Sequence, residues 1–437
     1  MRALLLIAPF LAFAQDTRHV VEPAIPPICA TVKAQLPAGL PDESKLDTAR
    51  IQGAIDQCPA GRAVVLKADG ASRAFLSGPL QLKNGVTLLV DAGAILFASR
   101  NPRDYDTAPG RCGTTDDSGK SCKPLIGGDG VSDAGVMGDG IIDGRGGAKL
   151  IGASVSWWDL AEEARVKNNH QNVPRLIVMS HARNFTLYRI TLKDSPNFHV
   201  VFGGNGFTAW GVTIHSPKNA RNTDGIDPIN ATNVTITNCF IHAGDDEVAI
   251  KANGAPATNM TIAHNHFYTG HGMSIGSETF GGVSAIRVSD LSIDGSDNGL
   301  RIKSNSSRGG LVHDVMYEDV CIQNTKNPIY MDSNYSFREA NQDKPPTYRE
   351  IFFRNVHILS GGKLTFDGLD SAHRLGMTLS GVTAREPVSM IARHADFILG
   401  PGPVDFKPSG EDVHMTAATG SFSATGCEGK FVALPLK

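Results

Sequence analysis

The sequence has no strong excess of charge of either sign. Its 437 residues include 41 Lys and Arg against 44 Asp and Glu, for a formal net charge of −3. Nucleic acids and anionic membrane surfaces favour strongly basic proteins, so we expect neither a nucleic acid nor a membrane as the partner. An anionic ligand would have to be bound by a few locally placed cations.

The sequence also lacks a hydrophobic run of the roughly 20 residues that a membrane-spanning helix needs. The shorter apolar run from Ala3 to Phe13 follows the cationic Arg2 and precedes a small-residue cleavage pattern that ends at Ala14. This arrangement is typical of a secretory signal peptide. We therefore predict a signal peptide at residues 1–14, one domain at residues 15–437, and secretion to the extracellular space or the periplasm.

Cysteine is scarce, with seven residues, and no Cys-x-x-Cys or Cys/His cluster has the spacing of a zinc site. Two pairings are hypotheses for disulfides: Cys29 with Cys58, and Cys112 with Cys122. Cys239 and Cys321 lie within apolar strand patterns, so we predict that both are buried thiols.

A repeat of about 25 residues organises the middle of the chain. One apolar pattern (apolar-x-apolar-x-x-apolar-x-apolar) starts at Phe185, Val234, Ile286, Val315 and Ile351. A second strand pattern starts at Asp224, Asp246, His271, Asn298 and Asn327. Periods of this length indicate a solenoid whose short strands stack on those of neighbouring repeats. We predict an all-β fold, a single parallel β-helix of about ten coils.

Two segments outside the repeat have expected places. An amphipathic helix is predicted from Leu46 to Cys58, where it would cap the open end of the solenoid and protect its strand edge. The polar loop from Asn101 to Lys123 and the Trp157-Trp158 segment should decorate one side of the coils. For the tryptophans, a structural role and substrate stacking both remain open.

The second pattern places Asp224, Asp246 and His271 in one column on three consecutive coils, with Asp245 beside Asp246. Neighbouring strands lie roughly 4.7–4.9 Å apart, so these side chains should cluster. Repulsion between clustered carboxylates raises at least one pKa, as a general acid beside a general base requires. Glycosidic bond cleavage uses such a pair of carboxyl groups.

Cations follow on the same face. Alternation along the strand turns Leu300 and Ile302 inward and Arg301 and Lys303 outward, where they can bind a sugar carboxylate. Acidic catalysts beside such anchors predict a polyuronate substrate. A calcium site is the competing interpretation of the acidic cluster, although His271 is a poor calcium ligand.

Other polar residues have simpler explanations. We assign Asp227, Asp294 and Asp297 to turn chemistry. His199, which we place in the Arg301 column, is open between a substrate contact and a packing role. The recurring Asn-x-Thr triplets at Asn184, Asn233 and Asn259 share one phase of the repeat, so turn chemistry explains them better than glycosylation.

Four motifs occur in order: Asn222-Thr-Asp-Gly, Gly244-Asp-Asp, Gly270-His-Gly and Arg301-Ile-Lys. Together they resemble the signature motifs of the polygalacturonases, glycoside hydrolase family 28, and the likeness to bacterial endo-polygalacturonases extends over nearly the whole mature chain. The resemblance implies a right-handed, pectin-lyase-like parallel β-helix. It also implies hydrolysis of α-1,4 bonds between galacturonate units of pectin, without a cofactor or metal, and we expect a monomer.

The resemblance implies roles for single residues. Asp245 would be the general acid, and Asp224 and Asp246 would activate the attacking water, with inversion at the anomeric carbon. His271 would tune the acid or bind substrate, and Asn222 would shape the Asp224 turn or touch sugar. Arg301 and Lys303 would hold a galacturonate carboxylate on the reducing-end side of the cut. The substrate-binding tyrosine would be Tyr335, with Tyr330 as its rival.

Glu247 departs from the family pattern, in which an uncharged residue often follows the Asp pair, so local pKa values can differ. Within the same class, an exo-polygalacturonase and a rhamnogalacturonan hydrolase are alternatives. A calcium-dependent pectate lyase and a non-catalytic polysaccharide-binding solenoid are the alternatives from other classes. A mildly acidic optimum is expected, because the general acid must remain protonated.

Overall fold

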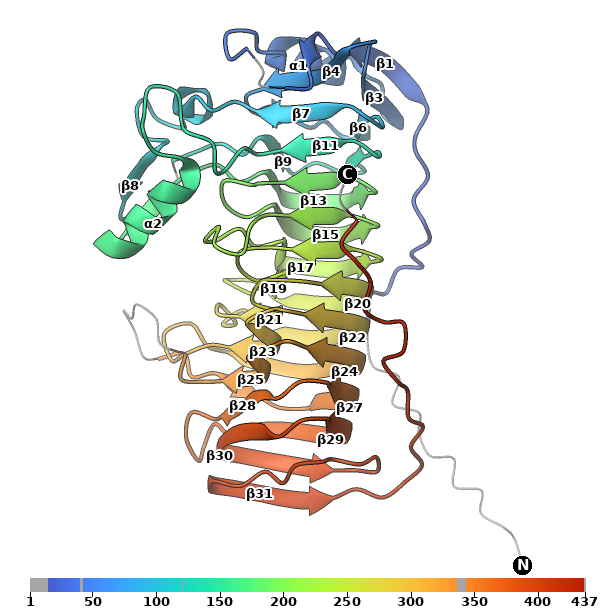
Figure 1. Ribbon diagram of the computed structural model, residues 1–437, viewed down its shortest axis with the longest axis vertical. Helices are drawn as coiled ribbons and strands as arrows, with labels where there is room; N and C mark the ends of the chain where they lie inside the picture. The colour runs from blue at the N-terminus through green and yellow to red at the C-terminus, as the bar shows by residue number, and fades with distance from the viewer. Residues whose placement is uncertain (1–14, 40–41, 120, 336–342, 436–437) are drawn as a thin grey trace, which may run out of the picture.

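The computed structural model describes residues 15–39, 42–119, 121–335 and 343–435. The predicted signal peptide at residues 1–14 lies outside them. The described chain forms one tall stack of coils, with the helix α1 (Thr48–Gln57) at one end and the strand β31 (Glu411–Ala417) at the other (Figure 1). The strands pair almost entirely in parallel, coil upon coil, which confirms the predicted right-handed parallel β-helix.

Three series of strands run along the stack. The first series, which we call the cleft sheet, pairs its members in this order: β5 (Leu80–Gln81), β9 (Ile126–Asp129), β13 (Ile177–Tyr188), β15 (Val200–Trp210), β17 (Ile226–Thr237), β19 (Val248–Ile250), β21 (Met273–Gly276), β23 (Asn298–Lys303), β25 (Asn327–Asp332), β28 (Gly362–Asp367) and β30 (Val388–Leu399).

The second series includes the later halves of β13, β15, β17 and β30. Its other members are β1 (Ile28–Lys33), β3 (Arg62–Lys67), β6 (Val86–Val90), β10 (Gly135–Met137), β20 (Ala257–Phe267), β22 (Val283–Asp294), β24 (Leu311–Gln323), β27 (Ile351–Ile358), β29 (Leu375–Ala384) and β31. The third begins with β4 (Ser72–Ser77), β7 (Ile95–Ala98), β11 (Ile141–Asp143), β14 (Thr191–Lys193), β16 (Thr213–His215) and β18 (Phe240–His242). It continues in the ends of β20, β22 and β24.

Short strands complete the described structure. β2 (Leu36–Pro37) pairs antiparallel with β4, and β26 (Thr347–Tyr348) pairs with β24. β8 (Thr114–Asp116) and β12 (His170–Asn172) form a separate antiparallel pair that projects from the stack beside α2 (Trp157–Lys167) in Figure 1. A 3₁₀ helix, η1, spans Pro102–Tyr105.

The apolar pattern of the repeat marks a corner between the second and third series. Its two central positions contain a residue with positive φ, such as Arg189 at 60°, Asn238 at 55° and Asn355 at 51°. Asn tolerates this left-handed conformation better than most residues. Asn233 and Asn259, of the Asn-x-Thr triplets, also have φ of 57°, in line with the predicted turn chemistry.

The inward side chains form one continuous core along the axis of the stack. Phe202 stacks on Phe207 at 4.9 Å between ring centroids, and Phe207 on Phe185 at 5.9 Å. α1 closes one end of this core by burying Ile51 and Ile55, which confirms the predicted cap. Burial of such side chains is the main favourable contribution to folding.

The Trp157-Trp158 segment begins the helix α2. Ser156 caps the helix together with Asp159, Trp157 is fully buried, and the indole of Trp158 donates to the carbonyl oxygen of Ser195 at 2.9 Å. These contacts give the tryptophans a structural role. Within the described residues, no helix combines the length and apolar character that crossing a bilayer requires.

Three disulfides are present among the described residues. The predicted pairs Cys29–Cys58 and Cys112–Cys122 are confirmed. The prediction that Cys321 is a free thiol is wrong, because it bonds to Cys427, 106 residues later. Cys239 is free and buried, as predicted.

Cys427 lies in the C-terminal segment, which leaves the last coil and runs back along the outside of the stack (Figure 1). Successive residues of this segment contact coils that lie earlier and earlier in the chain. Asn355 donates to the carbonyl oxygen of Ser423, and Lys430 pairs with Asp290. Tyr268 donates to the carbonyl oxygen of Val432. The repeat pattern does not extend into this segment, so no strand register predicts the position of Cys427.

Candidate active site

The predicted column of acidic residues is present on the cleft sheet. Ile226 of β17 lies level with Val248 of β19, and β21 continues the same register. Asp224, Asp246 and His271 precede these strands at equivalent positions, one on each coil. The backbone N–H of the residue after Asp224 donates to the Asp246 carbonyl oxygen at 2.9 Å, which fixes the two coils at this level.

One cleft of about 610 Å³ brings together all eight predicted site residues. They are Asn222, Asp224, Asp245, Asp246, His271, Arg301, Lys303 and Tyr335. Their proximity follows from the fold, because coils only one strand spacing apart carry them on a single face.

Arg301 and Lys303 point outward from β23, as predicted, and reach back to Asp246. The Arg301 Nη1 atom lies 3.2 Å from Oδ1 of Asp246, and the Lys303 Nζ atom lies 2.8 Å from Oδ2. Ser274 also donates to Oδ1 at 2.7 Å. Burial raises the pKa of Asp246, but the charges of Lys303 and Arg301 outweigh it and hold the pKa below its usual value.

Asp245 lies at the entry to β19 beside His271. The His271 Nδ1 atom is 3.0 Å from Oδ1 of Asp245, and Asn222 donates to Oδ2 at 3.3 Å. Burial raises the pKa of Asp245, but the hydrogen bond and charge of His271 and the two nearby cations outweigh it and lower the pKa. The pKa of His271 is raised, because the hydrogen bond and charge of Asp245 outweigh the effect of burial.

Asp224 is held by Lys251, which was not predicted as a site residue. The Lys251 Nζ atom lies 3.2 Å from Oδ2 of Asp224 and also contacts Asp227 closely. Burial, followed by the charge of Asp227, raises the pKa of Asp224 well above its usual value. One carboxyl pKa of the cluster is therefore raised, but mainly by burial, and it belongs to Asp224 and not to Asp245.

Asp227 does not have the turn role assigned to it. It lies inside β17, is fully buried, and forms an ion pair with Lys251. Burial raises the pKa of Asp227 to about 6. The pKa of Lys251 is raised well above its usual value, because the charges of Asp227 and Asp224 outweigh its own burial.

Tyr335, the favoured tyrosine, lines the cleft, whereas Tyr330 does not. The Arg301 guanidinium lies 5.4 Å from the Tyr335 ring centroid and 5.5 Å from that of Tyr330. The Tyr330 hydroxyl donates to Asp332, the second residue after it. The position of Tyr335 supports it as the substrate-binding tyrosine.

His199 is a packing residue. Its Nδ1 atom lies 3.0 Å from the carbonyl oxygen of Asp224, and its Nε2 atom lies 3.0 Å from Ser216 Oγ. Burial lowers the pKa of His199 to about 4. The predicted column was also wrong, because the strand register places Val201, not His199, level with Asp227 and so in line with Arg301.

Glu247 points away from the cleft, although it directly follows the Asp pair. Its carboxyl accepts hydrogen bonds from the Gly272 N–H and the Ser296 hydroxyl inside the stack. Burial raises the pKa of Glu247 to about 8. Its effect on the cleft is therefore indirect.

Asp297, assigned to turn chemistry, also belongs to the cleft wall. It lies 3.3 Å from Lys218 and 2.9 Å from Lys326, and its Oδ2 atom is 3.8 Å from His271 Nε2. Asp297 lies just before β23, as Asp245 lies just before β19. This equivalent position could have indicated from the sequence that Asp297 belongs to the site.

Asp245, Asp246 and His271 each present one possible ligand atom, all within 4.8 Å of one another. This is the one such group of three found in the described residues. Arg301 and Lys303 already contact both oxygens of Asp246, and a divalent cation would have to displace their positive charges. The donor set therefore fits a metal poorly.

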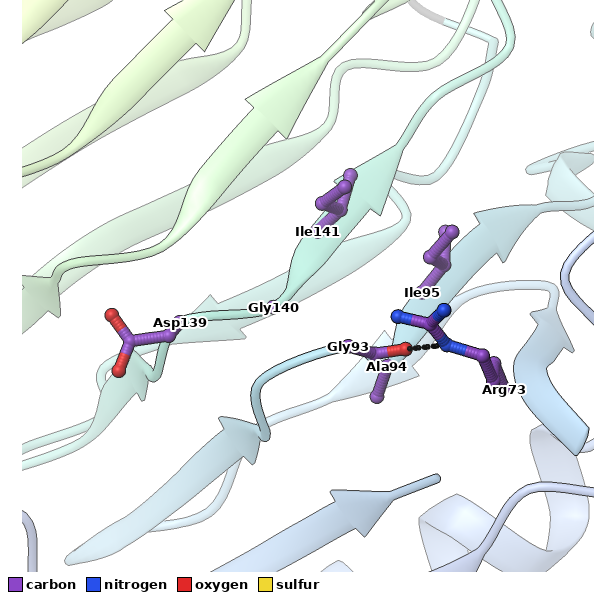
Figure 2. Close-up of a pocket in the computed structure, with 7 residues that line it drawn as sticks. All are labelled: Arg73, Gly93, Ala94, Ile95, Asp139, Gly140 and Ile141. Atoms are coloured by element: carbon purple, nitrogen blue, oxygen red, sulfur yellow. Dashed lines mark hydrogen bonds between the residues drawn. The ribbon is translucent and has the colours of Figure 1, made fainter. Parts of the chain in front are cut away.

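A second hollow lies far from these acids, between the coils of β4, β7 and β11 (Figure 2). It measures about 270 Å³, and Arg73 at its edge donates to the carbonyl oxygen of Gly93 at 2.9 Å. Ile95 and Ile141 line it, with Asp139 as its single carboxylate. It lacks the paired carboxyl groups of the cleft.

Paired carboxyl groups in a cleft across a parallel β-helix, beside fixed cations, define a glycoside hydrolase. The sequence profile of the Glycosyl hydrolases family 28 matches residues 71–386, and the chain belongs to this family. The family predicted from the four motifs is thereby confirmed.

Several characterised proteins are similar to this chain. An endo-polygalacturonase of Pectobacterium carotovorum subsp. carotovorum is 46% identical over 374 residues, which cover 85% of this chain and 90% of the relative. A polygalacturonase of Ralstonia nicotianae is 40% identical over 494 residues, covering 96% and 92%. The solved structure of a polygalacturonase from Erwinia carotovora ssp. carotovora matches with a TM-score of 0.77 at 39% identity, covering 94% of this chain and all of that one.

Proposed function

We propose that the protein is an endo-polygalacturonase that hydrolyses α-1,4 bonds between galacturonate units of pectate, with inversion at the anomeric carbon. The observation that carries this proposal is the cleft in which clustered aspartates lie beside Arg301 and Lys303. Such cations can bind the carboxylate that distinguishes a uronate from a neutral sugar. The names of the similar Pectobacterium proteins support endo action.

In this proposal Asp245 protonates the glycosidic oxygen, while Asp246 and Asp224 activate the attacking water. Arg301 and Lys303 bind the galacturonate carboxylate on the reducing-end side of the cut. These cations are already oriented, because their bonds to Asp246 fix them before substrate arrives.

The remaining predicted residues have supporting roles. His271 is hydrogen-bonded to Asp245, so its charge sets how readily that carboxyl takes up a proton. Asn222 donates to Asp245 and accepts from Gln171, which holds the carboxyl from its other side. Tyr335 closes the cleft over Arg301 and Lys303 and would contact the bound sugar.

In the free protein, the pKa values of Asp245 and Asp224 are shifted in directions that do not suit catalysis. The pKa of Asp245 is lowered and that of Asp224 is raised, whereas catalysis needs a proton on Asp245. Against the effect of burial, the hydrogen bond and charge of His271, followed by the charges of Lys303 and Arg301, hold the pKa of Asp245 down. A uronate carboxylate on Arg301 and Lys303 would offset the contribution of these two cations. We propose that substrate binding itself raises this pKa, while Asp246 remains an ionised base.

Product analysis on polygalacturonate tests the proposal. Mixed oligomers without unsaturated ends are expected, whereas monomer or dimer alone would indicate exo action, and unsaturated uronates would indicate a lyase. Asp245→Asn should lower hydrolysis by about 10²–10⁴-fold with its circular dichroism unchanged. Asp129→Asn, an exposed position on β9, is the matched control. Normal turnover by Asp245→Asn would contradict the proposal.

We further propose that the mature protein acts as a secreted monomer with one catalytic domain from residue 15 onward. Three disulfides support an oxidising compartment outside the cytoplasm. Cell fractionation with N-terminal sequencing tests the signal peptide at residues 1–14, and light scattering tests the monomer. Retention of residues 1–14 on the exported protein would contradict the cleavage site.

A further inference from the structure

The column of equivalent positions that contains Asp224, Asp246 and His271 continues toward the N-terminal end of the stack. The N–H of Leu176 donates to the carbonyl oxygen of Phe198, and the N–H of His199 donates to that of Asp224. These bonds set Arg175, Phe198 and Asp224 level with one another on the successive coils of β13, β15 and β17. Arg175 therefore lies two coils beyond Asp224, on the side opposite to Arg301 and Lys303.

Phe198 links this extension to the cleft. Its ring lines the cleft, with the Lys251 Nζ atom 4.3 Å and the Arg175 guanidinium 4.8 Å from its centroid. These distances are those of cation–π contacts. The aromatic ring thus orients two cations, but Lys251 is already engaged in ion pairs with Asp224 and Asp227, which leaves Arg175 for a ligand.

Arg175 is exposed, and its Nε atom makes one long side-chain contact of 3.4 Å, with Asn197 Oδ1. No ion pair of Arg175 is found within the described part of the chain. Two other cations of the cleft have carboxylate partners: Arg308 pairs with Glu278, and Lys218 with Asp297. An oriented guanidinium that is not engaged in an ion pair is suited to a carboxylate supplied by a ligand.

We propose that Arg175 binds the carboxylate of a galacturonate unit on the non-reducing side of the cleaved bond, about two units beyond the one at Asp224. This inference rests on the proposed function. Two coils correspond to about 10 Å, and a 1,4-linked pyranose has roughly the length of one coil spacing. A polymer lying along the cleft would place its first anchored carboxylate at Arg301 and Lys303 and a distant one at Arg175.

The test uses galacturonate oligomers from trimer to octamer, labelled at the reducing end, with the full-length variant Arg175→Gln. A trimer placed across the cut cannot reach Arg175, whereas longer oligomers can. We expect kcat/KM to fall about tenfold on long oligomers and to stay unchanged on the trimer. The cut positions of long oligomers should also spread. Arg175→Lys should retain part of the preference.

Arg183→Gln is the matched control, because Arg183 is exposed on the same strand β13 but lies in its later half, away from the cleft. Equal kcat/KM for wild type and Arg175→Gln on every length would overturn the inference. An equal loss on every length would overturn it too, since that result means a structural role. Failure of the wild type to hydrolyse any oligomer would instead refute the proposed function.

Discussion

Replacing Lys251 by methionine should move the acidic limb of the pH–activity profile to higher pH. Lys251 and Asp224 lie 3.2 Å apart, with 12% and 4% of their side chains exposed. Unit charges at this distance interact by about 1 kcal/mol at the dielectric constant of water and by about 5 kcal/mol at an effective value near 20. One pKa unit corresponds to about 1.4 kcal/mol. Loss of the ammonium should therefore raise the pKa of Asp224 by between about 1 and about 4 units.

The sign follows from the role proposed for Asp224. A base must be ionised, so a higher pKa means that activity begins only at higher pH. The assay is the pH dependence of kcat/KM on polygalacturonate, which reports the pKa values of the free enzyme. Lys193→Met is the control, because Lys193 also lies between two carboxylates, Asp143 and Asp194, but on the third series of strands.

Lys251→Arg, which keeps the charge, should hold the acidic limb closer to its wild-type position. Thermal melts at each pH must show that the variants remain folded over the range assayed. An acidic limb that stays in place in folded Lys251→Met would refute the reasoning, since it would mean that Lys251 does not control the ionisation of the base.

Three further outcomes are expected. Glu247 is protonated in the fold up to a pKa of about 8, against 4.5 for its ordinary value, so the stability of the wild type should fall as pH rises through this window. Glu247→Gln should make that fall shallower and raise the unfolding free energy at pH 8 by about 2–5 kcal/mol in urea titrations; an unchanged slope would contradict the burial argument. Replacing Cys321 and Cys427 together by alanine should cost about 2–5 kcal/mol of stability without changing kcat, measured by denaturation and by reducing-sugar release. A chelator should leave hydrolysis unchanged, and restoration of lost activity by Ca²⁺ would contradict the metal-free site.

The site could be predicted from the sequence because residues at equivalent positions of the repeat lie close together in this fold. Parallel coils pair residue by residue, so residues that begin the same pattern, such as Asp224, Asp246 and His271, must lie one strand spacing apart. The same rule could have revealed Lys251, which ends the pattern begun by Asp246. In the strand register, Lys251 lies level with Gly276 on the next coil and with Lys303 on the coil after that.

Other features could not be predicted from the repeat. Tyr335 lies beyond the end of β25, so only the resemblance indicated it. Cys427 lies in a segment without strand periodicity, and its partner was therefore hidden. His199 was misplaced by two residues, because the lengths of the turns between coils, and not the pattern alone, set the register. Side-chain reach was hidden too: nothing in the spacing shows that Arg301 extends back to Asp246.

The pKa shifts in the cleft favour different pH ranges for different steps of the reaction. Asp224 must lose its proton to act as a base, and its raised pKa favours the less acidic side. His271 must stay charged if the cleft is to attract a polyanion, and Asp227, with a pKa of about 6, adds a negative charge as pH rises. Asp245 must hold a proton to act as the acid, and its lowered pKa favours the more acidic side. As pH rises, the base becomes ionised, but affinity for the substrate and acid catalysis both weaken. Activity should therefore be greatest in a narrow pH range on the acidic side of neutrality, and Lys251 should set the lower edge of this range.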